Sequence, residues 1–277
     1  MRRGQRRHGE AAAAERVEHA AARRVGKRAE HAIEGGVLIL NHAVEYHPAP
    51  RRVSRCRPMA TRKRTARRED LGLTRAEFAV LRRLDTPRKI QAYLYGLKQN
   101  FEPGGDTCRP VRVVLREGNA HCIEGAMLAA AALWVHGERP LLLDLRAVRD
   151  YDHVVALFRR RGRWGAFSKT NGVGLRGRDP VYRNLRELAM SYFHEYANRR
   201  DHKTLREFSV PYDLRRVDPA VWASGQKNAW AVAEALDELR HFPLVTGHHL
   251  KAVTRRDPFE RKVGGLLQYR RPRGKRK

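Results

Sequence analysis

The stretch GNAHCIEGA, residues 118–126, places Cys122 where a turn gives way to a predicted helix. The chain has two other cysteines, Cys56 and Cys108, and this odd number and wide spacing favour neither a disulfide framework nor a CxxC zinc site. A thiol has an ordinary pKa of about 8.5, and a helix N-terminus lowers it by favouring the thiolate. Cys122 is therefore a candidate nucleophile, although a buried structural cysteine would fit the same position.

A histidine at the start of a later apolar segment could act as its base. His153 opens HVVALF, and after RRRGR the segment WGAFSK follows from Trp164. This pattern predicts an antiparallel hairpin, and because both segments are apolar on both faces, we expect them inside a sheet. An imidazole beside the thiol would favour the thiolate and carry its proton, so the pair predicts a thiol nucleophile with a general base. A satisfied histidine at a strand end is the structural alternative.

The hairpin also suggests what would orient the imidazole. If Arg159 faces Trp164, Ser168 lies on the same face of the sheet as His153. A register shifted by one residue exchanges the faces and puts Asn171 opposite His153 instead. We rank Asn171 before Ser168, because an amide oxygen can accept the imidazole N–H and hold the ring in one tautomer.

These segments resemble the transglutaminase-like cysteine enzymes, whose core has papain-like geometry. The resemblance covers residues 119–178 and rests on GNAHCIEGAMLAAAALWVHG and DHVVALFRRRGRWGAFSKTN; the flanking TPRKIQAYLYGL and RELAMSYFHEY resemble a bacterial branch of that superfamily. It implies Cys122 as nucleophile, His153 as general base, no cofactor, and an oxyanion held by the Cys122 backbone N–H and Asn119. Family members usually carry an aspartate where this chain has Ser168.

The elements around these residues can be predicted from caps and periodicity. Thr74 and Glu77 form a capping box, and Thr86 followed by Pro87 starts a second helix. VRVVL, residues 111–115, reads as a short extended segment, and the helix from Cys122 should end at Gly137. PLLLDL and TLREFSV read as strands, whereas VYRNLRELAMSYFHEYANRR and NAWAVAEALDELRHF have helical periodicity. The expected fold class is α+β, with the nucleophile helix packed on an antiparallel sheet.

Composition divides the chain into three parts. Residues 1–58 are rich in Arg, Ala, His and Glu and show no sustained apolar face, so we expect a disordered extension, or upstream sequence with Met59 as the true start. Residues 59–268 should form a single domain, and residues 269–277 a basic tail. No apolar run approaches the roughly 20 residues that span a bilayer, so the expected location is cytoplasmic without membrane association.

Two functions from different classes follow. The first is a cysteine-dependent acyl transfer on a peptide or amide substrate, by hydrolysis or transamidation. The second is a catalytically inactive basic module on the same fold that binds nucleic acid or an acidic partner. It is suggested by the net charge of +28, although a solvated surface and tail with only weak, non-specific nucleic-acid contact would also explain that charge.

Overall fold

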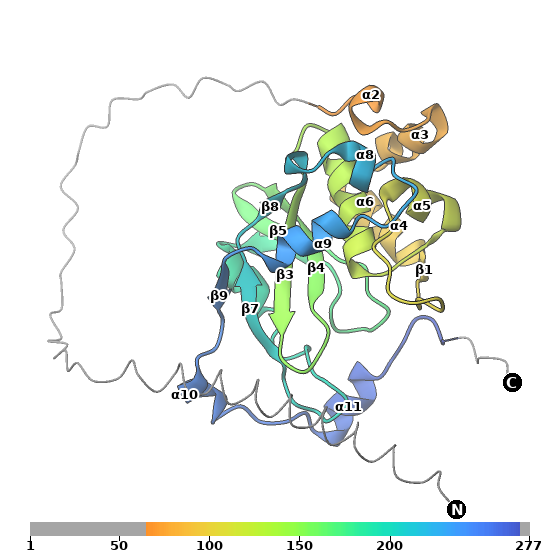
Figure 1. The fold of residues 1–277 in the computed structure, drawn as a ribbon. Helices are drawn as coiled ribbons and strands as arrows, with labels where there is room; N and C mark the ends of the chain where they lie inside the picture. Colours follow the sequence, from red (N-terminus) through yellow and green to blue (C-terminus); the bar gives the residue numbers. More distant parts are fainter. Residues whose placement is uncertain (1–64, 272–277) are drawn as a thin grey trace, which may run out of the picture. The chain divides into compact units, whose positions relative to one another are not determined.

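A seven-stranded antiparallel sheet lies at the centre of the fold (Figure 1). The computed structural model describes residues 65–271. The strand order is β6-β5-β4-β3-β7-β9, and β8 also pairs with β3. The strands are β3 (Leu141–Ala147), β4 (His153–Arg160), β5 (Arg163–Phe167), β6 (Arg178–Tyr182), β7 (Leu205–Ser209), β8 (Tyr212–Asp213) and β9 (His241–Pro243). The prediction of mixed helices and an antiparallel sheet is confirmed.

The predicted hairpin is β4–β5, and its register is the first of the two considered. Arg159 pairs with Trp164. The two turn residues, Arg161 and Gly162, have φ values of 47° and 80°, which suits a tight hairpin turn. Because β4 and β5 each have strands on both sides, the hairpin lies inside the sheet as expected.

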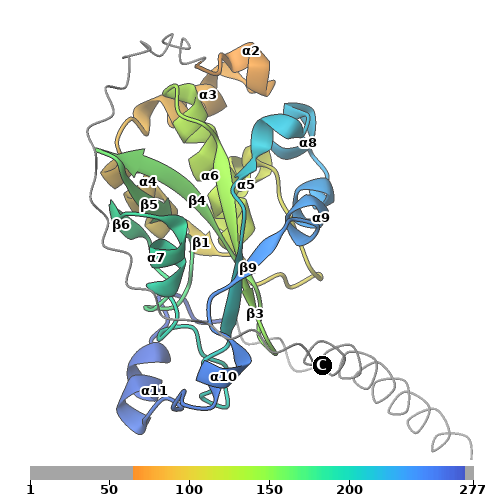
Figure 2. The same ribbon diagram turned by 90° about the vertical axis from the view of Figure 1, so that its left-hand side faces the viewer.

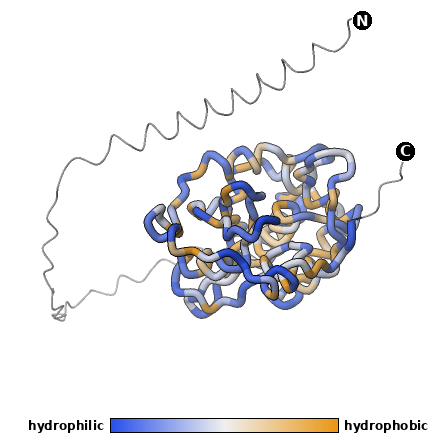
Figure 3. The backbone as a smooth tube through the Cα atoms, turned by 90° about the horizontal axis from the view of Figure 1, so that it is seen from below, coloured by the Kyte–Doolittle hydropathy of each residue, from blue (hydrophilic) through white to orange (hydrophobic). Residues whose placement is uncertain are grey.

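Each face of the sheet is covered by its own apolar core. Along β4, Val154 and Ala156 belong to the core on the α6 side, whereas Val155 and Leu157 belong to the other. This alternation is the period-two pattern of a strand buried on both faces. Figure 3 shows hydrophilic residues along most of the outer loops.

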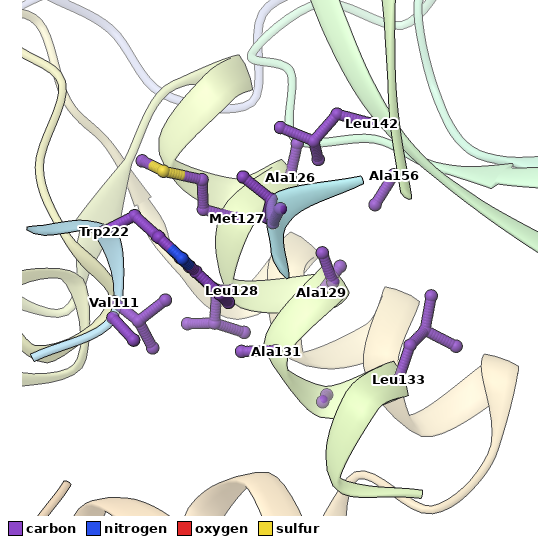
Figure 4. Packing of buried hydrophobic residues seen from close by; sticks show 14 of the residues in the cluster. Val111, Ala126, Met127, Leu128, Ala129, Ala131, Leu133, Leu142, Ala156 and Trp222 are labelled. Carbon is purple, nitrogen blue, oxygen red and sulfur yellow. The ribbon is translucent and has the colours of Figure 1, made fainter. Parts of the chain in front are cut away.

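Helix α6 (Cys122–Val135) is the central helix of the first core (Figure 2). Twelve of its residues are buried, and it packs against β4 and β3 and against the helices before it. Leu142 and Ala156 of the sheet lie on one side of it, and Val111 and Trp222 on another (Figure 4). A helix that is apolar all round is one surrounded by protein, so its starting residue is held firmly in place.

Three predicted helix boundaries are confirmed, and one segment that was predicted to be extended is helical. The caps at Thr74 and Thr86 start α3 (Arg75–Arg83) and α4 (Pro87–Gly96), and α6 ends just before Gly137. Residues 111–115, expected to be extended, instead lie in helix α5 (Val111–Glu117). Its C-cap, Gly118, has a φ of 64°, and three of its valines are buried, so packing on α6 outweighs the β preference of valine.

The remaining helices are short. The segment predicted as one long helix near residue 190 forms only α7 (Leu185–Met190) and then a series of turns, yet Tyr192, Phe193 and Tyr196 are buried all the same. TLREFSV contains β7 and NAWAVAEALDELRHF contains α9, as predicted. The other elements are α2 (Arg68–Leu71), β1 (Lys98–Gln99), β2 (Asn119–Ala120), the 3-10 helix Leu214–Arg216, α8 (Pro219–Trp222), α9 (Trp230–Asp237), α10 (Gly247–Leu250) and α11 (Pro258–Gly264).

Several expectations concern the chain ends. The predicted extension at residues 1–58, the start at Met59 and the last six tail residues lie outside the described part of the chain. Tyr269, predicted to open the tail, is hydrogen bonded to Asn171 within the fold. Between residues 65 and 271, no helix has both the length and the apolar character needed to cross a bilayer.

Candidate active site

Cys122 is the first residue of α6 and is half-buried in the wall of a pocket. The pocket has a volume of about 1030 Å³. It is bounded by the loop before α5, the start of α6, the start of β4, residues 169–175 and helix α11. Backbone N–H groups in the first turn of a helix have no partner four residues back, so the thiol stands where a negative charge is stabilised.

His153, the first residue of β4, lines the same pocket, and its positive charge helps to lower the pKa of the Cys122 thiol. Its Nε2 is 2.8 Å from Ser168 Oγ, and both side chains are buried. The Ser168 hydroxyl donates its hydrogen to the carbonyl of Leu175, so Oγ accepts from the imidazole. The hydrogen of the neutral ring is therefore on Nε2, which leaves the Nδ1 lone pair to take a proton from the thiol.

The thiol of Cys122 has a pKa well below its usual range. Burial alone would raise that pKa, but hydrogen bonds and positive charge from His121 and His153 outweigh it. Cys108 lines the same pocket, and there burial raises the pKa of the thiol to about 12. Of the two described cysteines, only Cys122 has the electrostatic surroundings of a reactive thiol.

Two residues predicted for the site are hydrogen bonded to partners other than those expected. Asn171 lines the pocket, but its amide oxygen accepts from Tyr269 N at 2.8 Å and its Nδ2 donates to Tyr269 O at 2.9 Å, so Ser168 and not Asn171 meets His153. The hairpin register explains this, because it keeps Ser168 on the face that His153 uses. Asn119 lies in β2, where its oxygen accepts from Arg109 at 2.6 Å and its Nδ2 donates to Glu117 O. It is absent from the pocket wall.

His121, which from the sequence was considered only as a substitute base, and Glu124 make contacts at the site that the sequence did not predict. His121 Nδ1 is 3.8 Å from Cys122 Sγ, and Nε2 is 3.3 Å from a carboxylate oxygen of Glu124. Glu124 is fully buried, and its carboxylate also accepts from the backbone N–H of His121, a capping-box contact. The sequence does contain a hint of this contact: Glu124 is three residues after His121, the spacing of a capping box at the start of a helix.

The pocket wall is acidic, in contrast to the chain as a whole. It carries six carboxylate residues, against Lys169, Arg256 and three histidines, His121, His153 and His194. The acidic residues are Glu102, Asp106, Asp150, Asp152, Glu195 and Glu260. Among the residues that the structure describes, no group of three or more His, Cys, Asp or Glu side chains could hold a metal ion.

Comparison with known proteins adds no assignment to this geometry. No protein-family model matches the chain, and no curated protein matches it either.

Proposed function

We propose that the chain is a cysteine-dependent acyl-transfer enzyme with a transglutaminase-like, papain-like arrangement of its core. The observation that supports this most is that Cys122 and His153 line one pocket, where His153 lowers the pKa of the thiol and is hydrogen bonded in turn to Ser168. It joins a nucleophile to a base, and the base to a third group that fixes its tautomer.

The geometry suggests the steps. The Cys122 thiolate attacks the carbonyl carbon of a peptide or amide substrate, and His153 delivers a proton to the departing amine. The resulting thioester is then attacked by water, which gives hydrolysis, or by an amine, which gives transamidation. Both outcomes share the first half-reaction, so that half-reaction is the one to test.

The alternative, nucleic-acid binding by an inactive module, has less support at this pocket. Six carboxylates in the wall would repel phosphates, whatever the net charge of the chain. An acidic wall instead suits neutral or positively charged groups on the substrate.

Acylation by p-nitrophenyl acetate tests the proposal. The wild-type protein should release a burst of about one equivalent of nitrophenolate, with one acetyl group found on the Cys122 peptide by mass spectrometry. Cys122→Ala should show no burst, and His153→Ala should acylate at least about 100-fold more slowly. A wild-type protein that reacts no faster than Cys122→Ala would rule out the enzyme.

A further inference from the structure

His121 is held beside the nucleophile by three acceptors, of which Glu124 is fully buried. Its Nε2 lies 2.9 Å from the carbonyl of Thr107, 3.3 Å from Glu124 and 3.4 Å from Glu102. Nδ1 is the ring nitrogen that faces the sulfur of Cys122. One imidazole thus has acceptors on both of its nitrogens, which favours the form that carries hydrogen on both.

The charge of this imidazole is fixed by its surroundings. Burial opposes the charged form, but hydrogen bonds and negative charge from Cys122 and Glu124 raise the pKa of His121 to about 11. Glu124 is held as an anion by hydrogen bonds from Asn100, from Thr107 and from the backbone of Arg109. His121 is therefore poorly suited to be a base, and well suited to be a stationary cation.

Two other side chains that could supply a donor to the oxyanion are already hydrogen bonded to other partners. Asn119, expected to hold the oxyanion, is bonded to Arg109 and Glu117. Gln99 lines the pocket, but its Nε2 donates to the carbonyl of Asn100. Of these three side chains, His121 alone directs a donor at the reacting sulfur.

We propose that His121 is a catalytic residue whose Nδ1–H stabilises the oxyanion, a role that rests on the proposed function. When the thiolate attacks, a bond forms between Sγ and the acyl carbon, and the π electron pair of the carbonyl moves onto its oxygen. That oxygen is two bonds from Sγ, so a donor directed at the sulfur is close to it. When the intermediate collapses, the electron pair returns, the bond to the leaving group breaks, and that group takes its proton from His153.

Two reagents distinguish stabilisation of the oxyanion by His121 from an effect of His121 on the reactivity of the Cys122 thiolate. Iodoacetamide reacts with a thiolate by displacement of iodide and forms no oxyanion, whereas p-nitrophenyl acetate must pass through one. Both rates are measured at about pH 9.5, above the ordinary thiol pKa of about 8.5, so that the thiolate is populated in every variant. The variants are His121→Gln and His121→Asn, with His136→Gln, at the far end of α6, as the matched control.

The expected result for His121→Gln is a fall in the acylation rate of about 100-fold, with alkylation within about 3-fold of wild type. His121→Asn, whose amide nitrogen can replace Nδ1 as a neutral donor, should recover part of the lost acylation, and His136→Gln should change neither rate. Equal effects on both reagents, or full acylation at pH 9.5 in both variants, would overturn the role. If His121→Gln loses alkylation and its circular dichroism spectrum changes, that variant is misfolded. The same two rates measured in His121→Asn then decide whether His121 stabilises the oxyanion. Failure of wild-type acylation would instead count against the proposed function.

Discussion

At the scale of single residues, the candidate site was partly predictable. The types and order of Cys122 and His153 indicate thiol chemistry, and the structure brings them into one pocket. The third position could not be chosen from the sequence, because a one-residue slip exchanges Ser168 and Asn171 and both are able to accept from an imidazole. The contact of His121 with the sulfur depends on the conformation of the turn before α6, which no periodicity encodes.

Substitution of Ser168 tests which residue orients His153. Ser168→Ala removes the acceptor of Nε2–H, so the neutral ring is free to place its hydrogen on Nδ1, the nitrogen that must receive the thiol proton. Acylation by p-nitrophenyl acetate should fall by about 10-fold or more. Asn171→Ala is the matched control, because Asn171 is bonded to Tyr269, and it should acylate within about 3-fold of wild type. If instead Asn171→Ala acylates slowly and Ser168→Ala does not, Asn171 is the residue that orients His153.

At the scale of elements, sequence periodicity was reliable where a cap or a turn marks the boundary. The helices with Thr caps and the β4–β5 hairpin follow from local chemistry. Helix α5 could not be predicted in this way, because a run of valines locally favours a strand. It is helical because it packs against α6. The core position of α6 likewise depends on close contact with the segment that follows β5, and Gly125 lies at that contact.

Gly125→Ala tests that contact. A Cβ at this position would lie 2.4 Å from Cβ of Lys169, whose fully buried side chain donates to the carbonyl of Leu97. Alanine favours a helix by up to about 1 kcal/mol over glycine, but overpacking costs about 1–3 kcal/mol, so the free energy of unfolding should fall. Gly104→Ala lies in a loop with open space around it, so its free energy of unfolding, measured by chemical denaturation, should stay within about 0.5 kcal/mol of wild type. An equally stable Gly125→Ala would show that α6 and the segment around Lys169 pack less closely than the structure indicates.

At the scale of the whole molecule, charge is unevenly divided. The chain carries a net charge of +28, yet the wall of the pocket is acidic. Composition alone fits either a phosphate-binding surface or a solvated basic surface and tail, whereas the placement of the carboxylates shows that this pocket differs from the chain's average. We therefore expect the basic excess to affect solubility and non-specific contacts rather than binding in this pocket.

Titration of Cys122 tests the proposed catalytic pair most directly. Iodoacetamide labelling is followed against pH, with peptides resolved by mass spectrometry so that Cys56, Cys108 and Cys122 are counted separately. The pKa of Cys122 is held low by His121 and His153, so its thiolate should persist as pH falls, and the midpoint should lie well below about 8.5. In His153→Ala that midpoint should rise toward the ordinary value. An ordinary midpoint in the wild type, or the same low midpoint in both proteins, would contradict the pairing of Cys122 with His153.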